Sequence, residues 1–419
     1  MSRILQPIDL QRTKFPTLLS ALLTLLNDRL GESIVFPLLP FLLESFTSEG
    51  RILGLLSGSY ALAQFLVTPL IGALSDRYGR KPIIATCVTG SVLGLGLFAL
   101  TISLDWPSKA AFPLILLFLA RLIDGISGGT AATASAVLAD ISPPEQRARA
   151  FGLIGVAFGL GFIIGPFMGG VLAEFSVNLP VWVATGFALM NLIIVLKLLP
   201  ETHPVSARRN LPRKRDLSPF AQIARVMQNK EVGQLSLSFF LFFMAFNGFT
   251  AILVLYFKQR FNWGPATAST AFLIVGIVAT IVQGGLIGPL VKRFGELRLS
   301  VTGLGLVIVG CLMIPITNPD SARVGVYIAV AILATGTGLV TPTLRSLVSR
   351  RLDREGQGAA LGSLQALQSA GSFIGPPLAG IMYDIFGQSI PFLASSGLLL
   401  IAIALVSRSP LPEKKKTYK

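Results

Sequence analysis

Long apolar stretches recur along the chain, and short polar segments separate them. Each stretch is long enough to cross a hydrocarbon core of about 30 Å, which takes about 20 helical residues. Helices are required there because the backbone must satisfy its own hydrogen bonds in lipid. The pattern therefore predicts an all-α integral membrane protein with twelve transmembrane helices. The predicted spans are residues 17–43, 52–75, 83–104, 112–138, 151–174, 180–199, 233–257, 267–291, 299–317, 324–349, 359–383 and 389–408.

Composition and charge agree with a chain that faces lipid. Hydrophobic residues make up 52% and charged residues 13% of the chain, against roughly 25% charged residues in a soluble domain. Of the 35 Lys and Arg residues, 27 fall in alternate segments that include both ends of the chain, counting Lys197 and Arg408 at the adjoining span ends; five fall in the other loops and three deeper within spans. Because basic residues favour the cytoplasmic side, we expect both termini to be cytoplasmic. The net charge of +15 is then a topology signal, and no nucleic-acid partner is expected.

The longest polar stretch divides the chain into two halves. It predicts an N-terminal six-helix bundle (1–199), a cytoplasmic linker (200–231) and a C-terminal six-helix bundle (232–419). A basic run at 208–215 is typical of a solvated linker. Ser218 and Pro219 then resemble a helix start. The apolar positions that follow, Phe220, Ile223 and Met227, share one helical face, which predicts either a short helix on the inner membrane surface or a simple spacer.

Two patterns recur in the same order in both halves. The segment Gly72–Lys81 after the second span resembles Gly288–Glu296 after the eighth, with glycine, leucine, arginine, aromatic and glycine in register. Such repeats predict two pseudo-symmetric bundles with a solute site between them near mid-membrane. A second pattern, offset by 210 residues, pairs Gly152, Gly161, Gly165, Pro166 and Gly170 with Gly362, Gly371, Gly375, Pro376 and Gly380.

The loop after the second span places charges of both signs at the inner rim of the membrane. Gly72 and Gly79 are expected to permit close backbone approach and a tight turn. The charges can pair across the two halves when the inner side is closed and separate when it opens; a loop that only sets topology is the alternative. The candidate gating residues are Gly72, Asp76, Arg77, Gly79, Arg80 and Lys81.

Small residues line one face of the fifth span. Gly161, Gly165 and Gly169 recur every four residues, with Gly170 beside them, so another helix can approach closely. Pro166 removes a backbone donor and can bend the helix. The stripe predicts a pliant, ion-tight contact between helices that rock, or else static packing.

Five charges fall within spans of the first half: Asp28, Arg29, Glu32, Arg121 and Asp124. A charge at mid-bilayer costs at least roughly 2.5–3.5 kcal/mol, so lipid-facing positions are unfavourable. Asp28 and Glu32 lie one helical turn apart, as do Arg121 and Asp124, so each pair shares a face. The five residues predict either a proton-coupling cluster in an aqueous cavity or a permanently paired buried cluster.

Polar residues in other spans are candidate contacts for a substrate. With Arg29, the candidates are Tyr60, Gln64, Asn247, Gln283, Gln365 and Gln368. Gln64, Gln283 and Gln365 suit ordinary interhelical hydrogen bonds equally well. Arg345, near the inner end of its span, is expected to snorkel toward the headgroups.

These motifs resemble the major facilitator superfamily, specifically its twelve-helix drug/proton antiporter branch. The segment Gly72–Lys81 is similar to the signature loop of the superfamily, and the surroundings of Arg121 to its helix-four motif. The segment Gly161–Gly170 resembles the helix-five motif of antiporters. The stretch 139–170 and the surroundings of Asp28 also resemble the tetracycline efflux proteins.

The resemblance implies a latch role for Asp76 and Arg80. It also departs from this chain at Asp124, where the helix-four motif usually has glutamine. Desolvation and a nearby guanidinium shift a carboxylate's proton affinity in opposite directions. We therefore expect Asp28 and Asp124 to carry the transported proton, under the control of Arg121.

The predicted function is proton-coupled export of small amphipathic compounds, cationic drug-like compounds among them, by alternating access. The alternative is a facilitator or symporter of a metabolite or lipid. A receptor or scaffold on this fold is disfavoured by the intact gating motifs. No nucleophile–base set, metal cluster or phosphate loop appears, so neither an enzyme nor a cofactor is predicted. We expect a monomer in a bacterial cytoplasmic membrane, with protons, a small-molecule substrate and the bilayer as its partners.

Overall fold

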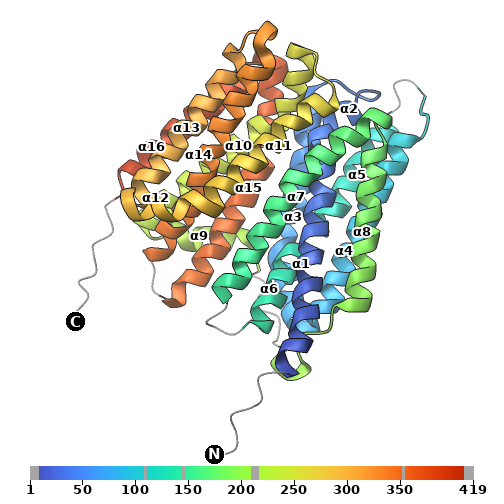
Figure 1. Cartoon of the computed structure of the whole chain (residues 1–419), viewed down its shortest axis with the longest axis vertical. Helices are drawn as coiled ribbons and strands as arrows, with labels where there is room; N and C mark the ends of the chain where they lie inside the picture. Colours follow the sequence, from blue (N-terminus) through green and yellow to red (C-terminus); the bar gives the residue numbers. More distant parts are fainter. Residues whose placement is uncertain (1–8, 108–110, 143–146, 209–216, 352–353, 410–419) are drawn as a thin grey trace, which may run out of the picture. The chain divides into compact units, whose positions relative to one another are not determined.

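The computed structural model describes residues 9–107, 111–142, 147–208, 217–351 and 354–409. Helices make up almost all of this part of the chain, and it contains no strand. The helices form two compact units (Figure 1). The first unit comprises Met1–Thr47 and Leu66–Leu217, and the second Ser48–Phe65 and Ser218–Lys419.

The first unit contains the chain up to Leu217, except for residues 48–65 with the beginning of α3. Its elements are α1 (Asp9–Val35), η1 (Phe36–Leu38), α2 (Leu39–Leu42), the end of α3 (Gly50–Tyr78), α4 (Arg80–Ser103), α5 (Phe112–Ile126), α6 (Thr130–Ile141), α7 (Arg147–Phe175), α8 (Leu179–Leu198) and η3 (Val205–Ala207). Helix α1 packs against α7 and α8, and α4 packs against α5 and α8 (Figure 1). Leu25, Val88, Val137 and Val195, from four different helices, meet in one buried cluster.

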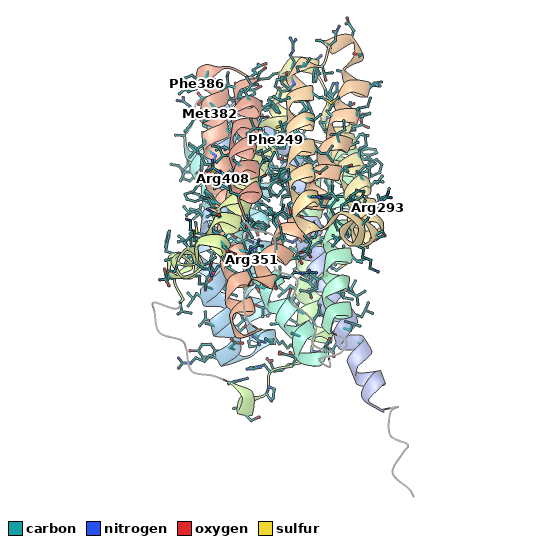
Figure 2. The ribbon with its side chains drawn as sticks, turned by 90° about the vertical axis from the view of Figure 1, so that its left-hand side faces the viewer. Phe249, Arg293, Arg351, Met382, Phe386 and Arg408 are labelled. Carbon is teal, nitrogen blue, oxygen red and sulfur yellow. The ribbon has the colours of Figure 1, made fainter. Side chains whose placement is uncertain are left out.

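The second unit contains the beginning of α3 and the rest of the chain. Its further elements are α9 (Pro219–Met227), α10 (Lys230–Phe261), α11 (Pro265–Ile281), the π-helical turn η4 (Val282–Leu286), α12 (Ile287–Phe294), α13 (Glu296–Ile316), η5 (Pro319–Ser321), α14 (Ala322–Arg350), α15 (Arg354–Phe386) and α16 (Ile390–Ser407). Helix α10 packs against α15 and α16, and α13 against α14. Phe249, labelled in Figure 2, is fully buried, and its ring lies 6.3 Å from that of Phe392.

The number of long helices agrees with the predicted twelve spans. Ten segments of the described chain are long and apolar enough to cross a membrane, counting α5 with α6, and α11 with α12, as one each. Two further helices, α1 and α15, have 27 and 33 residues. At about 1.5 Å per residue each exceeds a hydrocarbon core of about 30 Å. The chain is therefore a multi-pass, all-helical membrane protein.

The beginning of α3 belongs to the second unit because it lies against α15. A Cβ on Gly54 would approach the carbonyl carbon of Pro376 to 2.8 Å, so only glycine fits this crossing. The carboxylate of Asp384 accepts hydrogen bonds from the backbone N–H groups of Gly50 and Arg51, each at 2.8 Å. An acidic side chain at a helix N-terminus satisfies orphan donors and favours the helix dipole. Asp384 therefore caps α3.

Within the predicted linker, residues Pro219–Met227 form the short helix α9, while the basic residues at 209–215 lie outside the described residues. Helix α9 packs against α15 and α10 of the second unit. The ring of Phe220 meets that of Phe65 edge-on at 5.4 Å, and Ile223 packs beside it. The helix is thus docked on the second unit through its apolar face.

Candidate functional site

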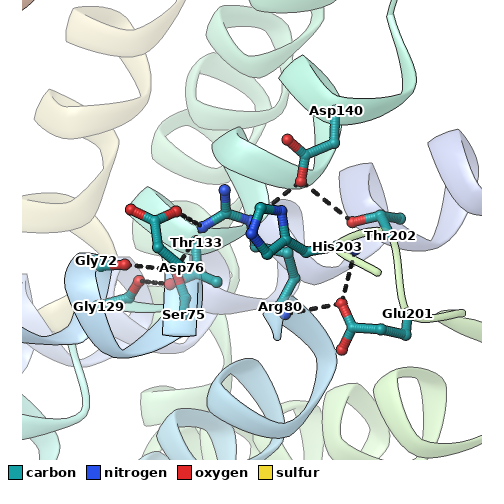
Figure 3. A network of polar contacts seen from close by, with 10 residues as sticks. All are labelled: Gly72, Ser75, Asp76, Arg80, Gly129, Thr133, Asp140, Glu201, Thr202 and His203. Carbon is teal, nitrogen blue, oxygen red and sulfur yellow. Dashed lines mark hydrogen bonds and ion pairs between the residues drawn. The ribbon is translucent and has the colours of Figure 1, made fainter. Parts of the chain in front are cut away.

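The loop between α3 and α4 centres on a buried arginine (Figure 3). Arg80 Nη1 lies 2.6 Å from Asp76 Oδ1 and 2.7 Å from the Ser75 hydroxyl, to which it donates. Arg80 Nε donates to Asp140 Oδ2 at 3.0 Å, and the Thr202 hydroxyl donates to the same oxygen at 3.4 Å. One guanidinium therefore ties together the end of α3, the start of α4 and the end of α6. Asp76 and Arg80 thus pair with each other within the first unit, and the pairing across the two halves that the latch hypothesis expects stays a prediction.

A third carboxylate, Glu201, binds the first backbone N–H groups of α4 next to this network. It accepts hydrogen bonds from the backbone N–H groups of Arg80 at 2.9 Å and Lys81 at 3.2 Å. It also accepts one from the backbone N–H of His203 at 2.9 Å (Figure 3). Glu201 thus caps α4. Sequence reasoning missed this residue, whose only signal was an acid directly after the last apolar residues of α8.

The remaining loop residues differ in what surrounds them. Gly79 has φ 106°, a backbone conformation that L side chains rarely adopt, so the predicted tight turn is present there. A Cβ on Gly72 would meet no atom within 4 Å, so the close approach expected at Gly72 is not found. Lys81 Nζ donates to the Leu196 carbonyl at 2.9 Å, and Arg77 lies over the ring of its neighbour Tyr78. Neither of these two bases takes part in the Arg80 network.

The second unit repeats the turn with the opposite charge. Gly295, before α13, has φ 80° and corresponds to Gly79 before α4. The next residue is the buried Glu296, where the first unit has Arg80. Glu296 Oε1 accepts from the Ser346 hydroxyl at 2.6 Å and lies 3.1 Å from Arg350 Nη2. An acid at the helix start and a base from the end of α14 replace the base and acid of the first unit.

Three charged residues in the second half of α1, Asp28, Arg29 and Glu32, pair with one another. Arg29 is hydrogen-bonded to Glu32, and its Nη2 lies 3.8 Å from Asp28 Oδ2. The guanidinium also lies over the ring of Phe158 on α7, 4.7 Å from its centroid. The side chains of Asp28, Arg29 and Glu32 keep 15%, 20% and 31% of their surface exposed. One base therefore serves two acids, so this group of three residues has one more carboxylate than guanidinium.

The charges of α5 are more deeply buried. Arg121 Nη1 lies 3.7 Å from Asp124 Oδ2, and the two residues are 4% and 7% exposed. Ser91 of α4 supplies a side-chain hydrogen bond to Asp124, which also interacts electrostatically with Asp28 of α1. A Cβ on Gly94 would lie 2.8 Å from the Asp124 Cβ, so a glycine makes room for this acid. The predicted clustering of the charges of α1 and α5 is present within one unit.

The glycine stripe of α7 faces α1. A Cβ on Gly161 would lie 2.7 Å from the Arg29 Cβ, and one on Gly169 would lie 2.7 Å from the Ile34 carbonyl oxygen. Gly165 lies against Ser33, whose hydroxyl donates to the Gly161 carbonyl at 2.8 Å. Pro166 and Gly170 are buried within the same continuous helix. The close contact predicted from the stripe therefore exists, and its partner is the helix that carries Asp28, Arg29 and Glu32.

The second unit contains the corresponding contact without charges. A Cβ on Gly371 of α15 would lie 2.8 Å from the Met244 backbone nitrogen, and one on Gly375 would lie 3.0 Å from that of Gly248. These glycines bring α15 against α10 as Gly161 and Gly165 bring α7 against α1. Packing of the glycine helices is therefore repeated in both halves.

The other candidate substrate contacts all belong to the second unit. Tyr60 and Gln64 lie in the part of α3 that groups with it, and Tyr60 is 9% exposed. The amide of Asn247 donates to the Phe243 carbonyl of its own helix at 2.9 Å. Gln283 lies in the π-helical turn η4, a distortion that is frequent at functional sites.

Gln365 and Gln368 of α15 both accept hydrogen bonds from Arg345 of α14, at 3.4 Å and 2.7 Å. These two candidate substrate contacts thus form one polar group with Arg345.

Comparisons with known proteins agree with this architecture. Residues 21–375 match the family model described as Major Facilitator Superfamily. The chain is 30% identical over 392 residues to the Tetracycline resistance protein, class C, of Escherichia coli, which covers 92% of this chain and 95% of that protein. It is 27% identical to Multidrug resistance protein 2 of Bacillus subtilis, with 95% of each covered. The crystal structure of the human organic anion transporter MFSD10 matches with a TM-score of 0.71 and 27% identity, over 96% of this chain and all of the other.

Proposed function

Because the chain belongs to the Major Facilitator Superfamily and is a membrane transporter, we propose that it exports small amphipathic, drug-like compounds in exchange for protons. Relatives named for resistance to tetracycline and to multiple drugs support drug-like compounds as the substrate class. We place the protein in a bacterial cytoplasmic membrane, acting as a monomer with both termini inside. Its two six-helix bundles, joined by the 200–231 linker, would alternate access to the substrate.

The charged cluster of α1 and α5 is the single observation that carries proton coupling. Three carboxylates, Asp28, Glu32 and Asp124, share two guanidiniums within the first unit. A set with one more acid than base can bind one proton without leaving an unpaired base. Burial favours the protonated form of a carboxylate, and a nearby guanidinium favours the ionised form. A change in either distance or wetting therefore loads or releases the proton.

In our proposal α7 moves during transport, and it packs directly against the charged residues of α1. The stripe of α7 touches α1 at Arg29 and Ser33, next to the acids. Glycine surfaces let two helices slide with little side-chain rearrangement. A shift of α7 against α1 would move Arg29, which also stacks on Phe158 of α7. Rocking of the helices would thereby change the pairing of Asp28 and Glu32.

Transport into sealed vesicles tests the proposal. Everted membrane vesicles should accumulate radiolabelled tetracycline when their interior is made acid, because protons leaving the lumen drive the drug in, and should not accumulate it when the exterior is made acid. Accumulation driven only by an exterior-acid gradient would instead favour a symporter of the same fold, because proton and solute then enter together, and tetracycline binding without flux would favour a receptor.

The variant Asp124→Asn should abolish uphill accumulation while retaining downhill exchange, because the amide cannot carry the proton. Asp105→Asn, an exposed acid in the loop after α4, is the matched control and should transport normally. Uphill transport by Asp124→Asn with the pH dependence of the unaltered protein would contradict the assignment.

A further inference from the structure

Three arginines lie within two turns at the end of α14, and two of them are neutralised by carboxylates. Arg350 Nη2 lies 3.1 Å from Glu296 Oε1. Arg351, labelled in Figure 2, has its Nε 3.5 Å from Glu231 Oε2. These ion pairs balance the charge where α14 meets α13 and α10.

Arg345 differs from both. Its hydrogen-bond partners are the amide oxygens of Gln368 at 2.7 Å and Gln365 at 3.4 Å. Its guanidinium carbon lies 5.7 Å from the centroid of the Phe239 ring, which is fully buried. Among the residues that the structure describes, no carboxylate forms an ion pair with Arg345. Its charge is thus solvated by two amides and a ring but is not neutralised.

The expectation that Arg345 snorkels toward the headgroups does not describe this arrangement. The hydrogen bonds hold the guanidinium against α15, one turn and more before the last residue of α14. Holding a cation within a predicted span is costly unless something compensates it, and such residues are functional by default. We infer that the compensating group is an anion that the described residues do not supply.

The unused donors suit such an anion. Both hydrogen bonds of Arg345 leave from Nη2, so Nε and Nη1 donate to no described residue. Because the two amide oxygens face the guanidinium, the amide nitrogens of Gln365 and Gln368 also keep their donors, and neither bonds to a described acceptor. A guanidinium presents its donors as a planar fork that matches carboxylate and phosphate oxygens. The side chain of Gln365 is exposed, which gives a ligand access.

We propose that Arg345, Gln365 and Gln368 form an anion subsite of the second unit, which takes the carboxylate or phosphate of an amphipathic molecule. The Phe239 ring places apolar surface beside the charge, so an aromatic or aliphatic group next to the anion is favoured. The description of this ligand as a substrate rests on the proposed function; binding itself does not. The anion has two sources, a soluble organic acid or a lipid headgroup.

Binding to the purified protein tests the subsite without any transport. The full chain is placed in phosphatidylcholine nanodiscs, and the affinities of 1-naphthylacetate and the neutral 1-naphthylacetamide are measured by calorimetry. The acid should bind at least tenfold more tightly than the amide. R345Q should remove this preference, and Arg345→Lys should restore part of it, because lysine supplies charge without the fork. Arg350→Gln is the matched control and should keep the preference, since Glu296 already neutralises Arg350.

Nanodiscs with phosphatidylglycerol distinguish the two sources. If a lipid headgroup occupies the subsite, the anionic lipid should weaken 1-naphthylacetate binding to the unaltered protein but not to R345Q. If the acid is the natural ligand, its tenfold preference should persist in both lipids. Equal affinities for acid and amide in both lipids, or a preference that R345Q leaves intact, would overturn the subsite.

If R345Q gives too little folded protein to measure, Gln368→Leu is tested in its place. This variant removes an amide donor and should reduce the preference for 1-naphthylacetate over 1-naphthylacetamide severalfold. An unchanged preference in that variant would equally overturn the subsite. Arg345-dependent binding in a protein without vesicle flux would contradict the proposed function and leave the subsite standing. Flux that is indifferent to the acid would contradict only the description of the bound anion as a substrate.

Discussion

The contact between Gly94 and Asp124 allows the charged cluster to be perturbed without removing a charge. In Gly94→Ala the added Cβ would lie 2.8 Å from the Asp124 Cβ, and 2.9 Å from both the Asp124 backbone nitrogen and the Ala120 carbonyl oxygen. Two of these atoms belong to the backbone of α5. Relief therefore requires α4 and α5 to separate, which moves Asp124 relative to Ser91 and Arg121.

The magnitude follows from two opposing terms. Inserting a methyl group into a close-packed contact costs typically about 1–3 kcal/mol. Alanine in place of glycine within a helix stabilises the folded state by about 0.5–1 kcal/mol. The neighbouring Gly96 provides the control, because a Cβ there would meet only Thr185 Cγ2 at 3.8 Å. Gly96→Ala gains the same helix propensity without the cost of overpacking. The free energies of unfolding of the two variants should therefore differ by about 1–3 kcal/mol.

The assay combines stability with coupling. Free energies of unfolding are measured by denaturant titration of both purified variants in the same detergent, and proton-driven substrate accumulation is measured in everted vesicles. Gly94→Ala should be the less stable variant and should accumulate less substrate per imposed pH unit, whereas Gly96→Ala should transport normally. Two variants of equal stability and equal coupling would refute the account of Gly94 as the residue that positions Asp124.

Two further predictions concern topology and gating. An impermeant thiol reagent applied to intact cells should label Asn262→Cys but not Ser206→Cys, because the basic-residue asymmetry places the linker inside; the reverse labelling would reverse the topology. Asp76→Asn should lower flux strongly, because it removes a charge from the gating loop. The folded yield should stay normal, because Asp76 is half-exposed and Arg80 keeps its bonds to Ser75 and Asp140. Flux near that of the unaltered protein, at equal expression, would exclude the latch.

Local features were predictable because they depend on neighbouring residues alone. The spans follow from runs of apolar residues, the start of α9 from Ser218 and Pro219, and the turn at Gly79 from a glycine within a polar loop. The stripe Gly161–Gly169 likewise predicted a close contact. The identity of its partner was not predictable, because nothing in α7 specifies that α1 covers the stripe.

Long-range partners could not be predicted from sequence for the same reason. Glu201 caps a helix that begins 121 residues earlier, and Asp384 caps one that begins 334 residues earlier. Each looks like an ordinary acid at the end of a span. Gly94 and Gly96 lie two residues apart on α4, and only the position of Asp124 on the adjacent helix distinguishes their surroundings.

The two halves preserve backbone geometry while reversing side-chain charge. Gly79 and Gly295 adopt the same kind of turn, since only glycine enters that conformation at low cost. The residues that follow, Arg80 and Glu296, are both buried and both bind an oppositely charged group near the end of another helix. A turn constrained by backbone sterics can persist through duplication, whereas an ion pair can be inverted if both partners change together. The repeat therefore accounts for the shared fold. The halves differ in their charged groups: the first contains the acid-rich cluster of α1 and α5, and the second contains Arg345, which pairs with no described carboxylate.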